Sequence, residues 1–142
     1  MSGTELPASL IAAYRATDYW VSLADNRFPL RIGEWSQALA DLLRATSARK
    51  AVFITAENPF SEATSASANE AAMAGLRRDL EKAGATIFEG YGQGQDTEWP
   101  PEASFLALGI GKREGGALGR KYRQNAIVWI GPDAIPELVF LR

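Results

Sequence analysis

The stretch from Lys50 to Gly84, KAVFITAENPFSEATSASANEAAMAGLRRDLEKAG, constrains the fold of this chain more than any other. It begins with AVFIT at residues 51–55, a continuous apolar and β-branched run. Such a run suits a strand that is covered on both faces, as in the middle of an α/β sheet. A polar loop follows, and then a helical pattern. The stretch therefore predicts a central strand, a loop and a helix around which the other elements are arranged.

The predicted helix carries signals at both of its ends. Ser67 and Glu70 have the spacing of a capping box, in which the serine oxygen accepts a helix N–H and the glutamate reaches back to the serine amide. Gly84 suits the left-handed conformation that often ends a helix. Between them, apolar residues recur at helical spacing and form one stripe: Ala72, Met73, Leu76, Leu80 and Ala83.

The remaining segments complete an α/β fold of mixed α+β character in one domain, residues 1–142. Strands are expected at 14–23, 28–32, 85–89, 104–110, 126–130 and 137–141, and helices at 34–46 and 112–123. Pro29 would place its strand at a sheet edge, and Gly115, Gly116 and Gly119 weaken the last helix. Residues 51–89 then form a βαβ unit with parallel strands and a right-handed crossover. We expect a mixed sheet of about six or seven strands and about three helices, with residues 1–12 as a short helical lead-in or an N-terminal arm.

The composition excludes several classes of function. The net charge is −2, so no overall basic field holds nucleic acid, and no apolar run reaches the length of a membrane span. The chain has no cysteine, which fits a cytoplasmic location and excludes thiol chemistry. It also has no histidine, which excludes the Ser-His-Asp triad and the common zinc sites. We therefore expect no metal and no cofactor, and any general base must be a carboxylate, a lysine or a tyrosine.

The loop after the central strand is the first candidate site. It holds Thr55, Glu57, Asn58 and Ser61, and Asn69 lies at the start of the next helix. Ligands in open α/β sheets bind outside the carboxyl ends of strands, and a helix N-terminus there attracts anions. These side chains therefore predict a site for a small polar or anionic ligand. The alternative is that Asn58 and Ser61 only build turns.

A second candidate is the stretch GRKYRQN at residues 119–125. Arg120, or Gln124 with Asn125, would reach the same end of the sheet and clamp the ligand, with Arg120 offering a bidentate fork to an anion. The alternative is that the cations here only offset the negative end of a helix dipole.

Two glycine-rich stretches and the glutamates are weaker candidates. GYGQGQ at 90–95 begins a predicted loop that reaches Pro101, and Trp99 in this loop would cover a pocket or pack. GIGKREGG at 109–116 follows a strand, but it lacks the Gly-Lys-Ser/Thr ending of a P-loop, so we reject a triphosphate site. Among the four glutamates that remain as acid–base groups, Glu57, Glu70, Glu98 and Glu102, the spacing selects no pair.

The segments AYRATDYWV, LRIG, FITAENPFS, WPPEASFLALGI and ALGRKYRQNAIVW together carry a resemblance. The chain resembles, from Tyr14 to Trp129, a family of small bacterial proteins known only as a domain of unknown function. The ITA-x-NP, WPPE and GR-x3-QNAIVW stretches are its most distinctive parts, and Gly115-Gly116 departs from it because a better helix former would be expected there. The resemblance implies a self-contained cytoplasmic domain and carries no catalytic role.

Two hypotheses of function follow. The first is a small-ligand-binding domain, with or without catalysis, whose site is the loop at residues 55–61. The second is a protein-interaction module without chemistry. It is based on Trp20, Trp35, Phe60 and Trp99, which lie in or beside predicted strand ends and loops, because exposed aromatic patches often mark partner surfaces.

Overall fold

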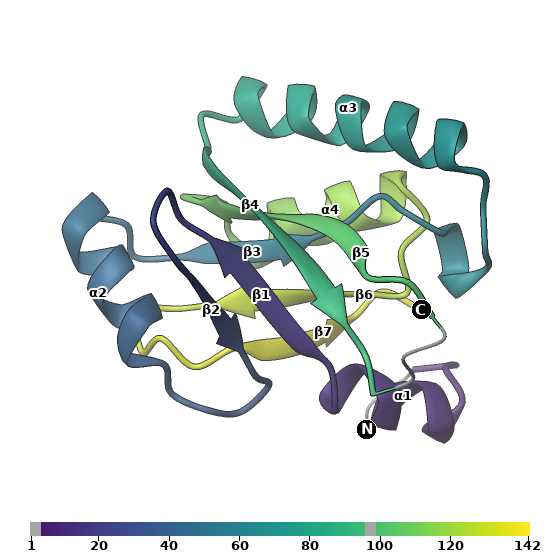
Figure 1. Ribbon diagram of the computed structural model, residues 1–142, viewed down its shortest axis with the longest axis horizontal. Helices are drawn as coiled ribbons and strands as arrows, with labels where there is room; N and C mark the ends of the chain where they lie inside the picture. Colours follow the sequence, from purple (N-terminus) through teal and green to yellow (C-terminus); the bar gives the residue numbers. More distant parts are fainter. Residues whose placement is uncertain (1–3, 96–98) are drawn as a thin grey trace.

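A computed structural model describes residues 4–95 and 99–142, which form one α+β fold around a seven-stranded sheet (Figure 1). The helices are α1 (Ala8–Arg15), α2 (Gln37–Thr46), α3 (Ala66–Lys82) and α4 (Lys112–Lys121), with a short 3₁₀ turn, η1 (Pro59–Ser61). The strands are β1 (Asp18–Ser22), β2 (Arg27–Leu30), β3 (Ala51–Ile54), β4 (Thr86–Gln93), β5 (Glu102–Leu108), β6 (Ala126–Ile130) and β7 (Glu137–Phe140). The α+β class and the number of strands are confirmed. The additional helix is α1, which lies where a lead-in or an arm was expected.

The strand order β2-β1-β4-β5-β3-β6-β7 differs from the order that a simple βαβ unit would produce. Strands β3 and β4 run parallel to each other, as expected, but β5 lies between them and pairs antiparallel with both. Every pairing among the described strands is therefore antiparallel, and the sheet is not mixed. Residues 104–108 are apolar except for Ser104 and are buried throughout, which explains why β5 takes a central position.

The two faces of the sheet carry separate hydrophobic cores. Helix α2 covers one face, where Leu39 and Leu43 pack with Phe53 and Leu106. Helices α3 and α4 cover the other face (Figure 1). The α3 residues Met73, Leu76 and Leu80 are buried as the stripe predicted, whereas Ala83 is exposed. The central strand β3 is buried along its whole length because both faces are covered.

The N-terminus of α3 differs from the predicted capping box. The helix begins at Ala66, and the Ser65 side chain accepts a hydrogen bond from the Ala68 amide at 3.2 Å. Ser67 therefore lies inside the first turn, and Ser65 caps the helix. The helix cap thus lies two residues earlier than predicted. A serine at either position has the oxygen that a cap needs, and the path of the preceding loop decides which one is used. Gly84 adopts the expected left-handed conformation, with φ of 82°.

The hairpin of β1 and β2 turns at Asp25-Asn26, and Pro29 lies on the edge strand β2, as expected. The loop expected from Gly90 begins later, because β4 continues to Gln93 and pairs with β1. A Cβ atom at Gly90 would lie 2.2 Å from the Trp20 carbonyl oxygen. The missing side chain at Gly90 therefore allows β4 to approach β1. The sequence pattern had suggested an irregular loop at this position.

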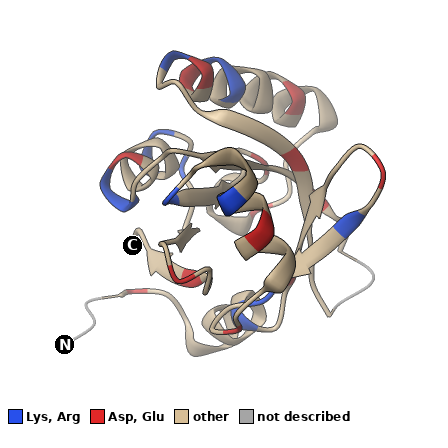
Figure 2. Ribbon diagram, turned by 90° about the vertical axis from the view of Figure 1, so that its left-hand side faces the viewer, with Lys and Arg blue, Asp and Glu red and all other residues tan. Residues whose placement is uncertain are grey.

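The surface carries charges of both signs. Acidic and basic residues are interspersed on the side of the molecule that Figure 2 shows. Within residues 4–95 and 99–142, no helix is both long enough and apolar enough to cross a membrane.

The glycines of α4 bring this helix close to the sheet. A Cβ at Gly115 would lie 2.6 Å from Val52 Cγ1 in β3, which is closer than real contacts allow. At Gly116 the nearest atoms, on Arg120 and Leu141, are both 3.6 Å away, an ordinary contact. Glycine is a poor helix former, but at position 115 a larger residue would overlap β3.

We predict opposite effects for alanine at these two neighbouring positions. Gly116→Ala should raise the free energy of unfolding by about 0.5–1 kcal/mol, because alanine favours the helix and finds room. Gly115→Ala should lower it by about 1–3 kcal/mol, because the new methyl group overlaps the branched side chain of Val52. Urea denaturation of both variants measures the difference. Equal effects of the two changes would contradict the close approach of α4 to β3.

Candidate functional site

The candidate site lies at the end of the sheet where β3 ends and β5 and β6 begin. The antiparallel register opposes Ile54 to Phe105 and Phe53 to Val128, so the segment after β3 meets the first residues of both neighbours. Helix α1, η1 and the C-terminus lie on this side as well (Figure 1). The fold therefore gathers polar side chains from several distant parts of the sequence at one place.

The loop after β3 has an unusual backbone. Asn58, Phe60 and Ser61 have φ values of 47°, 56° and 61°, all in the left-handed region that favours glycine. Asn58 is the most tolerant of the three, while a bulky residue such as Phe60 rarely adopts this conformation. The Phe60 amide donates to the Arg123 carbonyl at 2.7 Å, which fixes the turn to the segment before β6.

A pair of amide side chains holds the start of this loop. The Asn69 side chain accepts from the Asn58 amide at 2.9 Å and donates to the Asn58 side-chain oxygen at 3.1 Å. That oxygen also accepts from the Thr64 amide at 3.1 Å. Asn58 and Asn69 lie together, and these three hydrogen bonds hold the loop itself. Both residues therefore position the loop.

Two glutamates flank Asn58 on the side of β5. The Asn58 side chain donates to Glu102 Oε2 at 2.8 Å, and Glu57 Oε1 accepts from the Ala103 amide at 3.0 Å. Thr55 Oγ1 completes this side by donating to the Ala103 carbonyl at 2.7 Å. The sequence spacing selected no pair among Glu57, Glu70, Glu98 and Glu102. The structure brings Glu57 and Glu102 together, and Glu98 lies outside the described residues.

Both carboxyl groups have raised pKa values. Burial raises the pKa of Glu102, and hydrogen bonds from the Asn58 amide and the Trp99 indole lower it in part. Burial also raises the pKa of Glu57, with a further increase from the nearby Glu102 charge. The pair therefore holds its protons more readily than glutamates in water, a common property of acid–base and binding sites.

A second cluster lies on the side of β6. The Asn125 side chain donates to Ser61 Oγ at 3.2 Å and to the Tyr14 phenol oxygen at 3.0 Å. The Tyr14 and Ser61 hydroxyl oxygens are 2.6 Å apart, and Arg142 donates to the Asn125 side-chain oxygen at 3.2 Å. The Arg142 guanidinium carbon also lies 4.2 Å from the centre of the Phe60 ring. Ser61 and Asn125 thus meet, as the sequence led us to expect.

The two remaining predicted residues have different surroundings. Gln124 is buried and donates to the Glu57 carbonyl at 3.1 Å, so it links the start of β6 to the loop. Arg120 is exposed on α4, and no hydrogen bond or ion pair of the described residues joins it to this loop. A guanidinium is nevertheless present at the site, because Arg142 provides one.

Sequence reasoning missed Tyr14 and Arg142, which come from opposite ends of the chain. Tyr14 was assigned to a strand, and it is instead the penultimate residue of α1. No local pattern indicates either residue, since only the tertiary fold brings them to Ser61. Among residues 4–95 and 99–142, no group of three or more carboxylate side chains is arranged to hold a metal ion.

The fold and the site define a small α+β protein with a polar cluster at one end of an antiparallel sheet. The chain belongs to the family described as "Protein of unknown function (DUF3293)", which matches residues 54–127. That match runs from the end of β3 into β6 and includes all eight predicted site residues. No curated protein and no solved structure is significantly similar to the chain.

The raised pKa of Glu102 should make the stability of the protein depend on pH. A carboxyl whose folded pKa lies above its unfolded value stabilises the fold when protonated, and this contribution is lost as the pH rises through the folded pKa. Glu102→Gln removes the ionisation and keeps an oxygen that accepts from Asn58. The stability of the variant relative to the unmodified protein should therefore increase from pH 4 to pH 7.

Urea denaturation at the two pH values measures this difference. Glu70→Gln, on the exposed surface of α3, is the control for loss of a carboxylate. A relative stability that stays constant or falls between pH 4 and pH 7 would contradict the assigned surroundings of Glu102.

Proposed function

We propose that this protein binds a small polar ligand at the loop after β3. The observation that carries the proposal is the loop backbone, in which Asn58, Phe60 and Ser61 all have positive φ. Each such residue costs on the order of 1–3 kcal/mol, and residues of this kind cluster at binding and catalytic sites. A connection between β3 and α3 needs no such strain, whereas a site that aims particular side chains does.

The hydrogen bonds support a division of roles. Thr55, Asn58, Asn69 and Gln124 bond to the loop and to the strand beside it, so we assign them to positioning. Ser61 and Asn125 carry the polar groups that face Tyr14 and Arg142, and we assign them to ligand contact. Glu57 and Glu102 lie on the other side of Asn58 and provide the acidic groups. Arg142 takes the role that the sequence suggested for Arg120.

A thermal-shift screen of small polar metabolites tests the proposal. A compound at about 100 times its Kd should stabilise the folded protein by about 2.7 kcal/mol, which is several degrees in Tm. The shift should be much smaller for Ser61→Ala, because this variant lacks one of the contact groups.

Ser67→Ala is the matched control, since Ser67 is an exposed serine in the first turn of α3. It should respond to each compound as the unmodified protein does. Two results contradict the proposal: a polar library without a single hit, or hits that persist fully in Ser61→Ala. The cysteine-free sequence supports a cytoplasmic setting for this binding.

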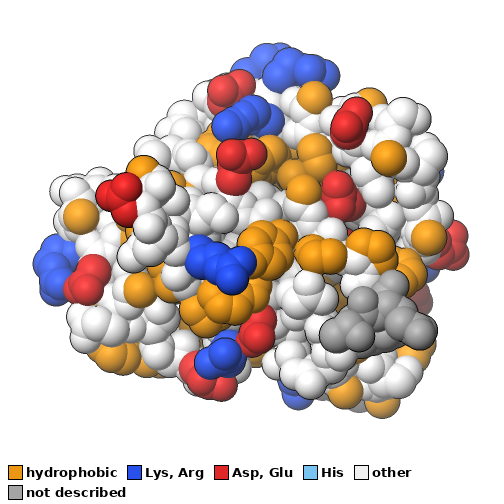
Figure 3. All heavy atoms as spheres, in the orientation of Figure 1, with side chains coloured by type: hydrophobic (Ala, Val, Ile, Leu, Met, Phe, Trp, Pro, Cys, Tyr) orange, Lys and Arg blue, Asp and Glu red, His pale blue; other side chains and the backbone are white. Residues whose placement is uncertain are grey.

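Exposed aromatic rings favour a second candidate, a protein-interaction role. Trp35, Phe60 and Trp99 expose 56%, 38% and 39% of their surface, so three of the four rings considered remain accessible. The fourth, Trp20, is half-buried and stacks on Tyr91, with the Arg27 guanidinium above it. Hydrophobic side chains gather at the centre of the face shown in Figure 3, where β1 and β4 lie in Figure 1. Trp35 is the most exposed ring and the clearest partner-binding candidate.

If Trp35 is available to a partner, it should contribute little to the fold. Trp35→Ser should change the free energy of unfolding by less than about 0.5 kcal/mol. Leu39→Ala, four residues later and fully buried, should cost about 2–5 kcal/mol in the same denaturation experiment. A loss of stability at Trp35 comparable to that at Leu39 would show that the ring serves the fold, and the interaction hypothesis would lose its main support.

A further inference from the structure

Helix α1 is attached to the protein without a buried side chain. It has eight residues, and none of them is buried. An isolated helix shorter than about 12–15 residues is marginal in water, so α1 depends on its contacts with the rest of the chain. Leu10, Ile11 and Tyr14 are half-buried, but neither hydrophobic core includes a residue of α1. Its polar contacts therefore matter for its attachment.

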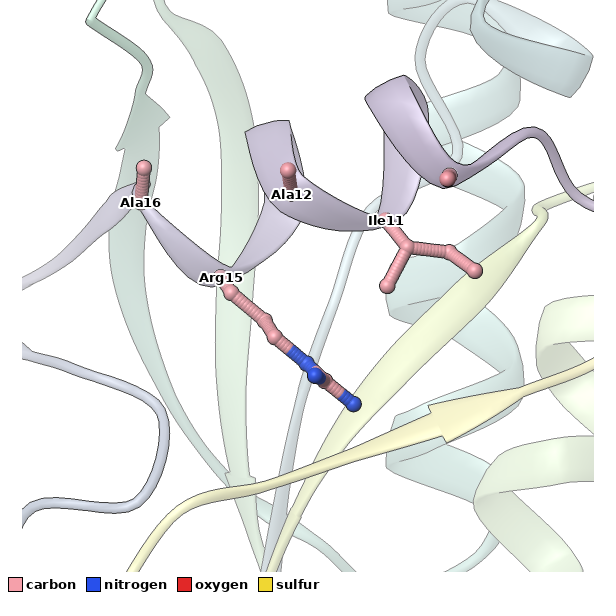
Figure 4. A pocket seen from close by; sticks show the side chains of 5 residues that line it. Ile11, Ala12, Arg15 and Ala16 are labelled. Atoms are coloured by element: carbon pink, nitrogen blue, oxygen red, sulfur yellow. The ribbon is translucent and has the colours of Figure 1, made fainter.

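The surface of α1 has a hollow of its own. A shallow hollow of about 540 Å³ is lined by residues of α1 and the residue that follows it (Figure 4). These residues are Ala8, Ile11, Ala12, Arg15 and Ala16. Because the walls come from this segment alone, the hollow lies on the helix surface and is no cavity between α1 and the sheet.

The Tyr14 phenol is the main polar attachment of α1 to the candidate site. Its oxygen lies 2.6 Å from Ser61 Oγ and 3.0 Å from Asn125 Nδ2. The Tyr14 carbonyl also accepts from the Tyr19 hydroxyl at 2.7 Å, close to the point where the chain enters β1. Release of the phenol would free Ser61 and Asn125 while the chain stays anchored at β1.

We propose that α1 is a lid over the site, and that the Tyr14 phenol stands where a ligand carboxylate binds when the lid opens. This inference rests on the proposed function, and it adds the class of ligand, a small planar carboxylate, and the device that controls access to it. The closed state is the one that the structure shows.

The groups around the phenol oxygen favour an anionic replacement. Asn125 Nδ2 is a donor, and the Ser61 hydroxyl can donate. The Arg142 guanidinium is bonded to the same Asn125 side chain and supplies a positive charge. A carboxylate accepts hydrogen bonds only, and charge-assisted bonds are roughly twice as strong as neutral ones. A carboxylate is thus better matched to these donors than the phenol that it replaces.

The surroundings also favour a planar group. The Tyr14 side chain that now occupies the place is an aromatic ring ending in an oxygen, and the Phe60 ring lies beside the Arg142 guanidinium. Benzoate is likewise an aromatic ring with oxygen at one end, there as a carboxylate that carries a full negative charge. Benzamide has nearly the same shape and no charge, so a comparison of the two probes isolates the effect of the negative charge.

Hydrogen exchange followed by mass spectrometry tests the lid. In Tyr14→Phe, residues 8–16 should exchange roughly threefold to tenfold faster than in the unmodified protein, because the bonds to Ser61 and Asn125 are lost. Tyr122→Phe is the matched control, since it removes another tyrosine hydrogen bond, made at 2.6 Å to Asp79 in α3. It should leave exchange over residues 8–16 unchanged. Unchanged exchange in Tyr14→Phe as well would overturn the lid.

The same measurement with added benzoate or benzamide tests the ligand class. Millimolar benzoate should accelerate exchange over residues 8–16 in the unmodified protein, and benzamide should not. Tyr14→Phe should bind benzoate more tightly, because the open state of its lid is more populated. The gain in affinity should not exceed the increase in the population of the open state. Equal effects of the two probes, or no effect of either, would overturn the carboxylate assignment.

The results separate this inference from the proposed function. If polar ligands bind in a Ser61-dependent way while exchange in α1 does not respond to Tyr14→Phe, the site stands and the lid fails. If α1 opens in Tyr14→Phe but the screen gives no Ser61-dependent ligand, the helix is mobile and the proposed function fails.

Discussion

Strand β5 pairs with β3 on one side and with β4 on the other, and most of the structure depends on this double pairing. Its buried residues, Ser104 to Leu108, reach both hydrophobic cores. Because β5 separates β3 from β4, helix α3 must cross over β5. The stripe of Met73, Leu76 and Leu80 then packs on the face of the sheet that α3 covers. The same insertion places Glu102, the first residue of β5, beside the loop that follows β3.

The site is therefore a product of strand order. Glu102 contacts the Asn58 amide only because β5 begins where β3 ends. On the other side of the loop, Asn125, the residue just before β6, lies at hydrogen-bonding distance from Ser61. An acidic side with Glu57 and Glu102 and a basic side with Arg142 result, and the strained loop lies between them. A ligand that meets both sides would experience a strong change of electrostatic potential over a short distance.

Local signals predicted the elements well, and non-local features explain what was missed. Helix α3, the left-handed Gly84 and the edge position of Pro29 follow from periodicity, from glycine conformation and from the missing proline N–H. The loop residues 55–61, with Asn69, were proposed as a site because polar residues follow an apolar strand, and the structure brings Gln124 and Asn125, but not Arg120, to this loop. Strand order leaves no such trace, since apolar strands that are buried on both faces look alike in a parallel and an antiparallel sheet. For the same reason, no pattern could link Tyr14 and Arg142 to Ser61.

The pairing of β1 with β4 has a consequence for the rate of folding. Trp20 lies opposite Tyr91, about 70 residues later, so the first hairpin can join the sheet only after a long stretch of chain has been brought together. The entropy of closing that loop must be lost before the new contacts compensate for it. The other edge carries the same cost, because β6 joins β3 through pairs such as Phe53 with Val128. The two edge hairpins themselves, β1 with β2 and β6 with β7, pair strands that are neighbours in sequence. We therefore expect both hairpins to form early and their joining to the central strands to be slow.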